Sequence, residues 1–209
     1  MKQIIPIMEQ IIFYVGMIIF SFTSLLFFIL KKKNPNLASF NMIVNFSTIA
    51  SYILMVSGLG VISATNGQLI YWTRWAFYAV SCSFLMVEIS VILRIDKDTK
   101  LEIIVFNSLV MVTGLFASIM PDLVKWLFFV LSSIAYVYVI FLINKNRSEN
   151  TFIICFIAIF WSGFPLVWLL SPAGFMILDA FWTALLYLVL DLITKVYFGF
   201  HSTMKYKTD

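Results

Sequence analysis

The stretch YWTRWAFYAVSCSFLMVEIS, residues 71–90, is apolar and long enough to cross a lipid bilayer as a helix, which needs about 20 residues. Two ionisable residues interrupt it, Arg74 near its start and Glu88 near its end. Charged side chains inside a membrane are costly and mark functional positions by default. The stretch therefore predicts a membrane helix that carries part of a functional site.

The rest of the chain shares this apolar character. Of its 209 residues, 62% are hydrophobic and 11% are charged, and the mean hydropathy is +1.01. Such a composition predicts an integral membrane protein. Segments long enough to span a bilayer as helices lie at 11–30, 38–60, 70–94, 101–120, 123–144, 151–171 and 177–200. We therefore expect an all-α bundle of seven transmembrane helices, with residues 1–209 forming one domain. No cleavable signal peptide is expected, because the first apolar run lacks a small-residue cleavage site.

The basic residues predict how this bundle is oriented, because lysine and arginine concentrate in cytoplasmic loops. Ten of the 14 basic residues fall on one side of the predicted bundle: Lys31, Lys32, Lys33, Arg94, Lys97, Lys100, Lys145, Arg147, Lys205 and Lys207. The opposite side has Lys2 and Lys125. We therefore expect a multi-pass protein of the cell membrane, with its N-terminus outside and its C-terminus in the cytoplasm. The net charge of +4 follows from this asymmetry and gives no reason to expect a nucleic-acid partner.

Four ionisable residues remain well inside the predicted spans: Arg74, Glu88, Asp191 and Lys195. A purely structural buried ion pair is the plain alternative to a functional role. Arg74, Phe77, Ser81 and Glu88 are separated by three, four and seven residues, so they line one face of a helix. At 1.5 Å per residue, Arg74 and Glu88 lie about 21 Å apart along the axis. A polar stripe is therefore expected to cross most of the membrane.

Asp191 and Lys195, in the stretch LDLITK, are spaced i, i+4 and share one helix face. A neutral lysine amine in an apolar bundle can condense with an aldehyde to form a Schiff base. A protonated Schiff base then needs a nearby carboxylate, and Asp191 is the obvious candidate. This pair predicts covalent binding of an aldehyde ligand at Lys195.

The stretch FWSGFPLVWLL, residues 160–170, carries Trp161, Phe164 and Trp168 on one helix face. Pro165 is expected to kink the helix beside them. An aromatic stripe of this spacing is typical of packing. Facing a buried lysine, it also forms a wall for a long, flat, apolar ligand. Cys82 and Cys155 show no pattern that predicts a metal site or a disulfide.

Three motifs, YWTRW, WSGFPLVW and LDLITKVYFG, make the whole chain similar to microbial rhodopsins. The resemblance implies all-trans retinal bound covalently to Lys195 as a Schiff base, with Asp191 as its counterion. Arg74 matches the family's arginine on the extracellular side. The residues that the resemblance places around retinal are Tyr78, where the family usually has tryptophan, together with Leu85, Trp161, Phe164, Trp168 and Thr194.

One position departs from the family's outward proton pumps, which have an aspartate where this chain has Phe77. Phenylalanine cannot accept a proton. The triplet Phe77, Ser81 and Glu88, with Cys82 directly after the serine, resembles the schizorhodopsins, which are described as light-driven inward proton pumps. This resemblance implies that the proton leaves toward the cytoplasm by way of Ser81, Cys82 and Glu88.

The expected function is therefore light-driven inward proton transport, and the chain is not expected to be an enzyme. Glu88 either holds the proton or only attracts it and organises water. The alternatives are a photosensor, a light-gated channel or an anion transporter that uses the same pigment. The family relation also implies a homo-oligomer, such as a trimer, in membrane lipid.

Overall fold

The computed structural model describes residues 4–64, 67–145 and 151–206. Within these residues, seven helices are long and apolar enough to span a membrane. Five are single elements: α1 (Ile7–Leu30), α2 (Pro35–Val56), α3 (Thr73–Ile92), α4 (Lys97–Ile119) and α5 (Asp122–Lys145). The sixth consists of α6 (Thr151–Phe156), η1 (Ile157–Trp161) and α7 (Ser162–Leu170), and the seventh of α8 (Ala180–Asp191), η2 (Leu192–Tyr197) and α9 (Phe198–Lys205). The prediction of an all-α seven-helix membrane bundle is confirmed.

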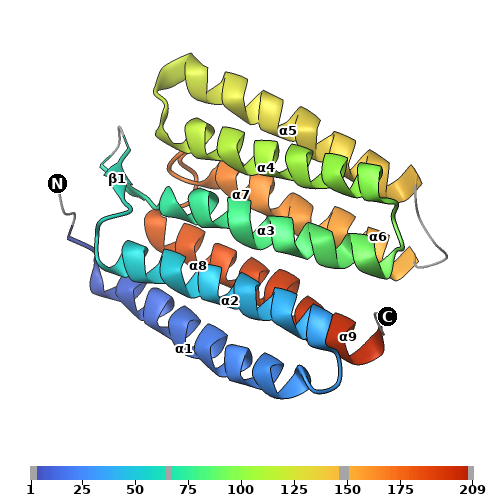
Figure 1. Cartoon of the computed structure of the whole chain (residues 1–209). Coiled ribbons are helices and arrows are strands. Elements are labelled where there is room, and N and C mark those ends of the chain that lie inside the picture. The colour runs from blue at the N-terminus through green and yellow to red at the C-terminus, as the bar shows by residue number, and fades with distance from the viewer. Residues whose placement is uncertain (1–3, 65–66, 146–150, 207–209) are drawn as a thin grey trace.

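The helices lie side by side and run alternately up and down the bundle (Figure 1). One end, which we call the basic end, holds the α1–α2 turn with Lys31–Lys33, the α3–α4 turn with Arg94, and the C-terminal end of α9 with Lys205. The opposite end, which we call the hairpin end, holds β1 (Ile62–Ser63) and β2 (Leu69–Ile70). Lys2, Arg147 and Lys207 lie outside the described residues. The predicted orientation, with the N-terminus outside, stays a prediction.

Four helix boundaries at the hairpin end differ from the predicted ones by three or four residues, and the first of these is the start of α1 at Ile7 rather than at 11. Helix α2 ends at Val56 rather than at 60, and Gly58 follows with a φ of 74°, which glycine adopts without steric cost. Helix α3 begins at Thr73 rather than at 70, because Leu69 and Ile70 pair with β1 in an antiparallel hairpin. Helix α8 begins at Ala180 rather than at 177, where the Asp179 side chain accepts a hydrogen bond from the Trp182 backbone N–H at 2.8 Å.

Side-chain caps also fix helix starts at the basic end. The Asn34 side chain accepts from the Leu37 backbone N–H, and Pro35 occupies the first turn of α2. Asp96 accepts from the backbone N–H groups of Asp98 and Thr99 at the start of α4. The hydrogen bond from Thr99 lowers the pKa of the Asp96 carboxyl below its ordinary value.

Two π-helical segments interrupt the last two membrane helices. Segment η1 ends at Trp161, four residues before Pro165 in α7. Proline has no N–H to donate to the carbonyl of Trp161, so the α-helical hydrogen bond cannot form there. Segment η2 contains Lys195. Because π segments are frequent at functional sites, both point to the region between the sixth and seventh membrane helices.

Candidate functional site

Lys195 lies in the centre of the bundle with its side chain 1% exposed. Its Nζ atom lies 2.8 Å from Asp191 Oδ1 and donates a hydrogen bond to Thr48 Oγ1 at 3.2 Å. The same atom lies 4.0 Å from the centre of the Tyr78 ring, at cation–π distance. Helix α2, helix α3 and segment η2 therefore meet at this amine.

Asp191 accepts from three further donors besides Lys195. Tyr52 Oη and Arg74 Nη1 donate to its Oδ2 atom at 3.0 and 3.2 Å, and Tyr78 Oη donates to Oδ1 at 2.8 Å. Arg74 is 2% exposed and its guanidinium lies 4.7 Å from the ring centre of Tyr187. Two positive charges and two hydroxyl donors thus surround one carboxylate. Buried charges need this degree of pairing to be tolerated in a membrane.

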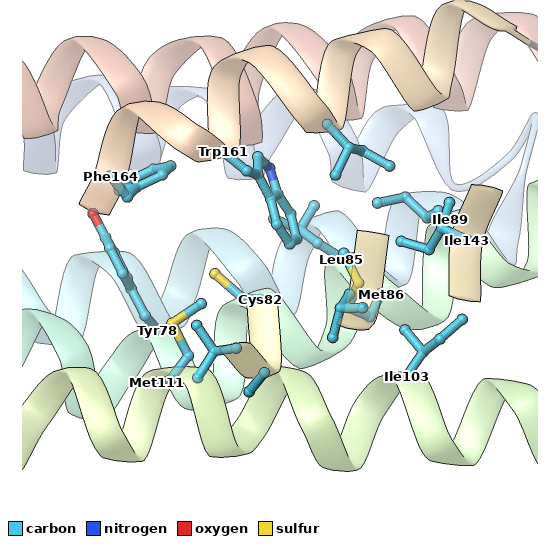
Figure 2. Close-up of a cluster of buried hydrophobic side chains, with 14 of the residues drawn as sticks. Tyr78, Cys82, Leu85, Met86, Ile89, Ile103, Met111, Ile143, Trp161 and Phe164 are labelled. Atoms are coloured by element: carbon cyan, nitrogen blue, oxygen red, sulfur yellow. The ribbon is translucent and has the colours of Figure 1, made fainter. Parts of the chain in front are cut away.

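A narrow apolar cavity lies beside this ion cluster. Its walls come from α3, α4, α5, the sixth membrane helix and η2: Trp75, Tyr78, Cys82, Leu85, Val110, Met111, Gly114, Ala117, Phe129, Ser132, Ser133, Tyr136, Trp161, Phe164, Pro165, Trp168 and Thr194. Figure 2 shows Trp161 and Phe164 on one side of this region, with Tyr78, Cys82 and Leu85 of α3 on the other. A Cβ atom at Gly114 would lie 2.9 Å from the Trp75 ring. The space is closely lined, mostly by aromatic and aliphatic groups, as pockets for apolar ligands are.

A second polar cluster surrounds Glu88, which is fully buried toward the basic end of α3. Its Oε1 atom accepts from Asn41 Nδ2 at 2.9 Å and from Ser202 Oγ. Its Oε2 atom has no hydrogen-bond partner among the described residues. Asn41 Nδ2 also lies 3.4 Å from Thr203 Oγ1. Helices α2, α3 and α9 therefore converge on this carboxyl group.

The sequence-predicted residues separate into these two clusters and the cavity. Arg74, Asp191 and Lys195 meet in the ion cluster, and Glu88 lies in the second cluster. Ser81 is buried between the levels of Arg74 and Glu88 on α3. The six residues predicted to surround retinal all line the cavity, and Cys82 lines it as well: Tyr78, Leu85, Trp161, Phe164, Trp168 and Thr194. Phe77 is only half-buried and is not part of the cavity wall.

Sequence reasoning missed the polar face of α2. Asn41, Asn45, Thr48 and Tyr52 are all buried. Asn41, Asn45 and Tyr52 donate hydrogen bonds to other helices, and Thr48 accepts one from Lys195. Their spacing of four, three and four residues is that of one helix face. This stripe of polar residues in an otherwise apolar span was the signal that could have revealed them.

A seven-helix membrane bundle with a buried, ion-paired lysine beside a narrow aromatic cavity defines a class of membrane proteins that hold an apolar ligand on a lysine. Comparison with protein families matches residues 8–206 to the family described as bacteriorhodopsin-like protein. The chain therefore belongs to the bacteriorhodopsin-like family. The resemblance to microbial rhodopsins is thereby confirmed.

Individual relatives differ in how similar they are to the chain. The crystal structure of schizorhodopsin 4 is 70% identical, covers 95% of this chain and 100% of its own, and superposes with a TM-score of 0.93. Bacteriorhodopsin-II of Haloarcula marismortui is 26% identical, over 72% of this chain and 67% of its own length. Sensory rhodopsin-2 of Haloarcula vallismortis is 24% identical, over 72% of this chain and 69% of its own length. The match thus spans about two thirds of these curated relatives.

Family membership implies a retinal chromophore bound to a lysine, and the residues present fit that group. Lys195 is the lysine whose amine lies in the bundle centre, at the Tyr78 ring. Tyr78 and Thr194, the residue before the lysine, both line the cavity. The wall of the cavity is mostly aromatic and aliphatic, which suits a polyene.

Proposed function

We propose that this protein is a light-driven inward proton pump of the cell membrane, with all-trans retinal carried on Lys195 as a Schiff base. When bound, retinal supplies light absorption and an isomerisation that changes the direction in which the nitrogen presents its proton. The proposal takes the basic end of the bundle as cytoplasmic and the N-terminus as external. The resemblance to schizorhodopsins also favours a homo-oligomer, such as a trimer, and this stays a prediction.

The observation that carries the proposal is the difference between the two carboxyl groups of the site. All described donors around Asp191, including Arg74 and Lys195, bind its ionised form. Addition of a proton to this carboxylate would disrupt its ion pairs with these two cationic groups. Phe77, where outward pumps of the family have an aspartate, cannot accept a proton. Release toward the hairpin end is therefore disfavoured.

Glu88 offers the opposite environment on the basic side of Lys195. Its carboxyl group contacts neutral donors, Asn41 and Ser202, and no cationic group pairs with it among the described residues. Ser202 is seven residues beyond Lys195, so this cluster lies about 10 Å further toward the basic end. A proton that leaves the Schiff base on this side is attracted toward Glu88 and the cytoplasm. Whether Glu88 binds the proton or only organises the water around it is a separate question.

Return of a proton must then come from the hairpin side. A second, small cavity lies there, and its wall includes the polar residues Tyr71, Arg74, Ser118 and Thr183. Arg74 lines this cavity and also contacts Asp191, so the cavity adjoins the ion cluster. We propose it as the uptake side of the pump.

The experiment that tests the proposal is the sign of the light-induced pH change outside weakly buffered cells that express the pigment. Inward pumping raises the external pH, and a protonophore abolishes the change. A fall in external pH contradicts inward transport. A stable pigment without any pH change supports a photosensor instead.

A further inference from the structure

We propose that retinal enters the protein sideways from the bilayer, through a port between α5 and α7 that the Tyr136–Ser162 hydrogen bond holds closed. This inference rests on the proposed binding of retinal at Lys195. It assigns a role to residues that the proton-transfer mechanism does not use.

The wall of the apolar cavity is unevenly covered. The lining residues from α3 and α4 are buried, among them Tyr78, Leu85 and Met111. The lining residues from α5, which include Ser132, Ser133 and Tyr136, are partly exposed, as is Pro165 of α7. The cavity therefore comes nearest to the outer surface of the bundle along the seam between α5 and α7.

This seam is also weakly packed. Helix α5 makes most of its contacts with α4 and few with the sixth membrane helix. Two small residues of α5, Ser132 and Ser133, line the cavity. Ser132 donates a hydrogen bond to the Val110 carbonyl, and Ser133 donates one to the Phe129 carbonyl. Neither side chain obstructs the seam. Trp161 and Pro165 lie in the interior of the span Thr151–Leu170, which is the part expected at the depth of the hydrocarbon core.

A hydrogen bond between Tyr136 and Ser162 joins the two helices across the seam. Ser162 Oγ donates to the Ala158 carbonyl at 2.6 Å, so Tyr136 Oη is the donor in its 3.1 Å contact with Ser162 Oγ. Ser162 is exposed on the outer face of α7. Interhelical hydrogen bonds inside membranes contribute modestly, so this one can open and close. Tyr136 lines the cavity and bonds to the exposed Ser162. The Tyr136 ring is therefore the flap of the port.

The chemistry of retinal also favours entry through the α5–α7 seam. A polyene aldehyde partitions into lipid rather than water, and the route from the hairpin end passes the buried charges of Arg74 and Asp191. Among the described residues, those of α5 and α7 that line the cavity are apolar or carry a hydroxyl group, and none is charged.

The test follows how fast colour returns after retinal is removed. Purified pigment in lipid is bleached with hydroxylamine under light, washed, and given all-trans retinal, and the rate constant is normalised to the final absorbance. Tyr136→Phe removes only the hydrogen bond and should speed the return about threefold, the factor for one average interhelical hydrogen bond in a membrane. Tyr136→Ala should be faster still, and Ser133→Phe, which fills the seam, should be slower than the parent.

Tyr138→Phe is the matched control, because Tyr138 is on the same helix but bonds to Glu102 outside the cavity. It should regain colour at the parental rate. Parental rates in both Tyr136 variants would overturn the port, even if Ser133→Phe fails to form pigment. Failure of the parent protein to form any pigment would instead overturn the proposed function on which the port rests.

Discussion

Asp191 Oδ1 lies 2.8 Å from Lys195 Nζ, one helical turn away, and both side chains are 1% exposed. An ion pair so deep in a membrane protein is costly unless every charge is compensated. Here Arg74, Tyr52 and Tyr78 complete the compensation on the carboxylate. The pair fixes the side of the lysine on which a stable negative charge stands, and this asymmetry is the basis of the proposed transport direction.

Replacement of Lys195 with alanine should abolish the visible pigment, because Lys195 is the buried lysine whose amine lies against the cavity-lining Tyr78 ring. Membranes that contain the variant are mixed with all-trans retinal, and the absorption spectrum is recorded. Lys205→Ala, at the surface of the basic end, should form the pigment normally. A visible, bleach-resistant colour in Lys195→Ala would remove the assignment of the attachment site.

Asp191→Asn should make the Schiff base lose its proton more readily, because the neighbouring negative charge is gone. The visible-to-ultraviolet colour change should then occur about 1–3 pH units lower than in the parent, the size of shift that a close opposite charge produces. A spectrophotometric pH titration measures it. An unchanged titration would mean that another group holds the positive charge.

Glu88→Gln keeps the shape of the side chain and its contacts with Asn41 and Ser202, but removes the titratable group. The initial transport rate should fall at least about tenfold, because a positioned proton-transfer group usually contributes that much or more. The pigment should still form. Glu102→Gln is the control, because Glu102 contacts Tyr138 at a distance from the site. Parental transport rates in Glu88→Gln would leave this carboxyl group with a structural role only.

Gly199→Ala tests whether Asn41 positions Glu88. A Cβ atom at residue 199 would lie 2.3 Å from Asn41 Oδ1, so the amide must shift, which disturbs its hydrogen bond to Glu88. Transport should slow by about threefold or more, with the absorption spectrum largely unchanged, as time-resolved absorption and pH measurements can determine. Met204→Ala, at an exposed position of α9, should behave like the parent. Equal transport rates in the two variants would separate Asn41 from the proton route.

The sequence predicted the seven spans and the ion pair because both depend on local spacing. Apolar length marks a membrane helix without reference to its neighbours, and residues 191 and 195 share a face by helix geometry alone. The β1–β2 hairpin was not predicted, because its strands have only two residues each and are stabilised by pairing with each other. The π segments depend on backbone hydrogen bonding around Pro165 and Lys195, which residue spacing does not reveal.

The environment of each charge could not be predicted in the same way. Tyr52 bonds to Asp191 across 139 residues of sequence, and Ser202 bonds to Glu88 across 114. Such contacts depend on how the helices pack and rotate against one another. The spacing of the polar residues in α2 indicates a face that contacts other polar groups. Which groups these are depends on how the helices pack.

The most direct test of the account is the external pH of a weakly buffered suspension of cells that express the pigment. On illumination the pH should rise, and it should relax in the dark. A protonophore should abolish the rise, whereas it would enhance a passive proton flux that follows another ion. Lys195→Ala cells, which lack the pigment, provide the baseline. A light-induced fall of the external pH in the parent cells, also abolished by the protonophore, would contradict inward pumping.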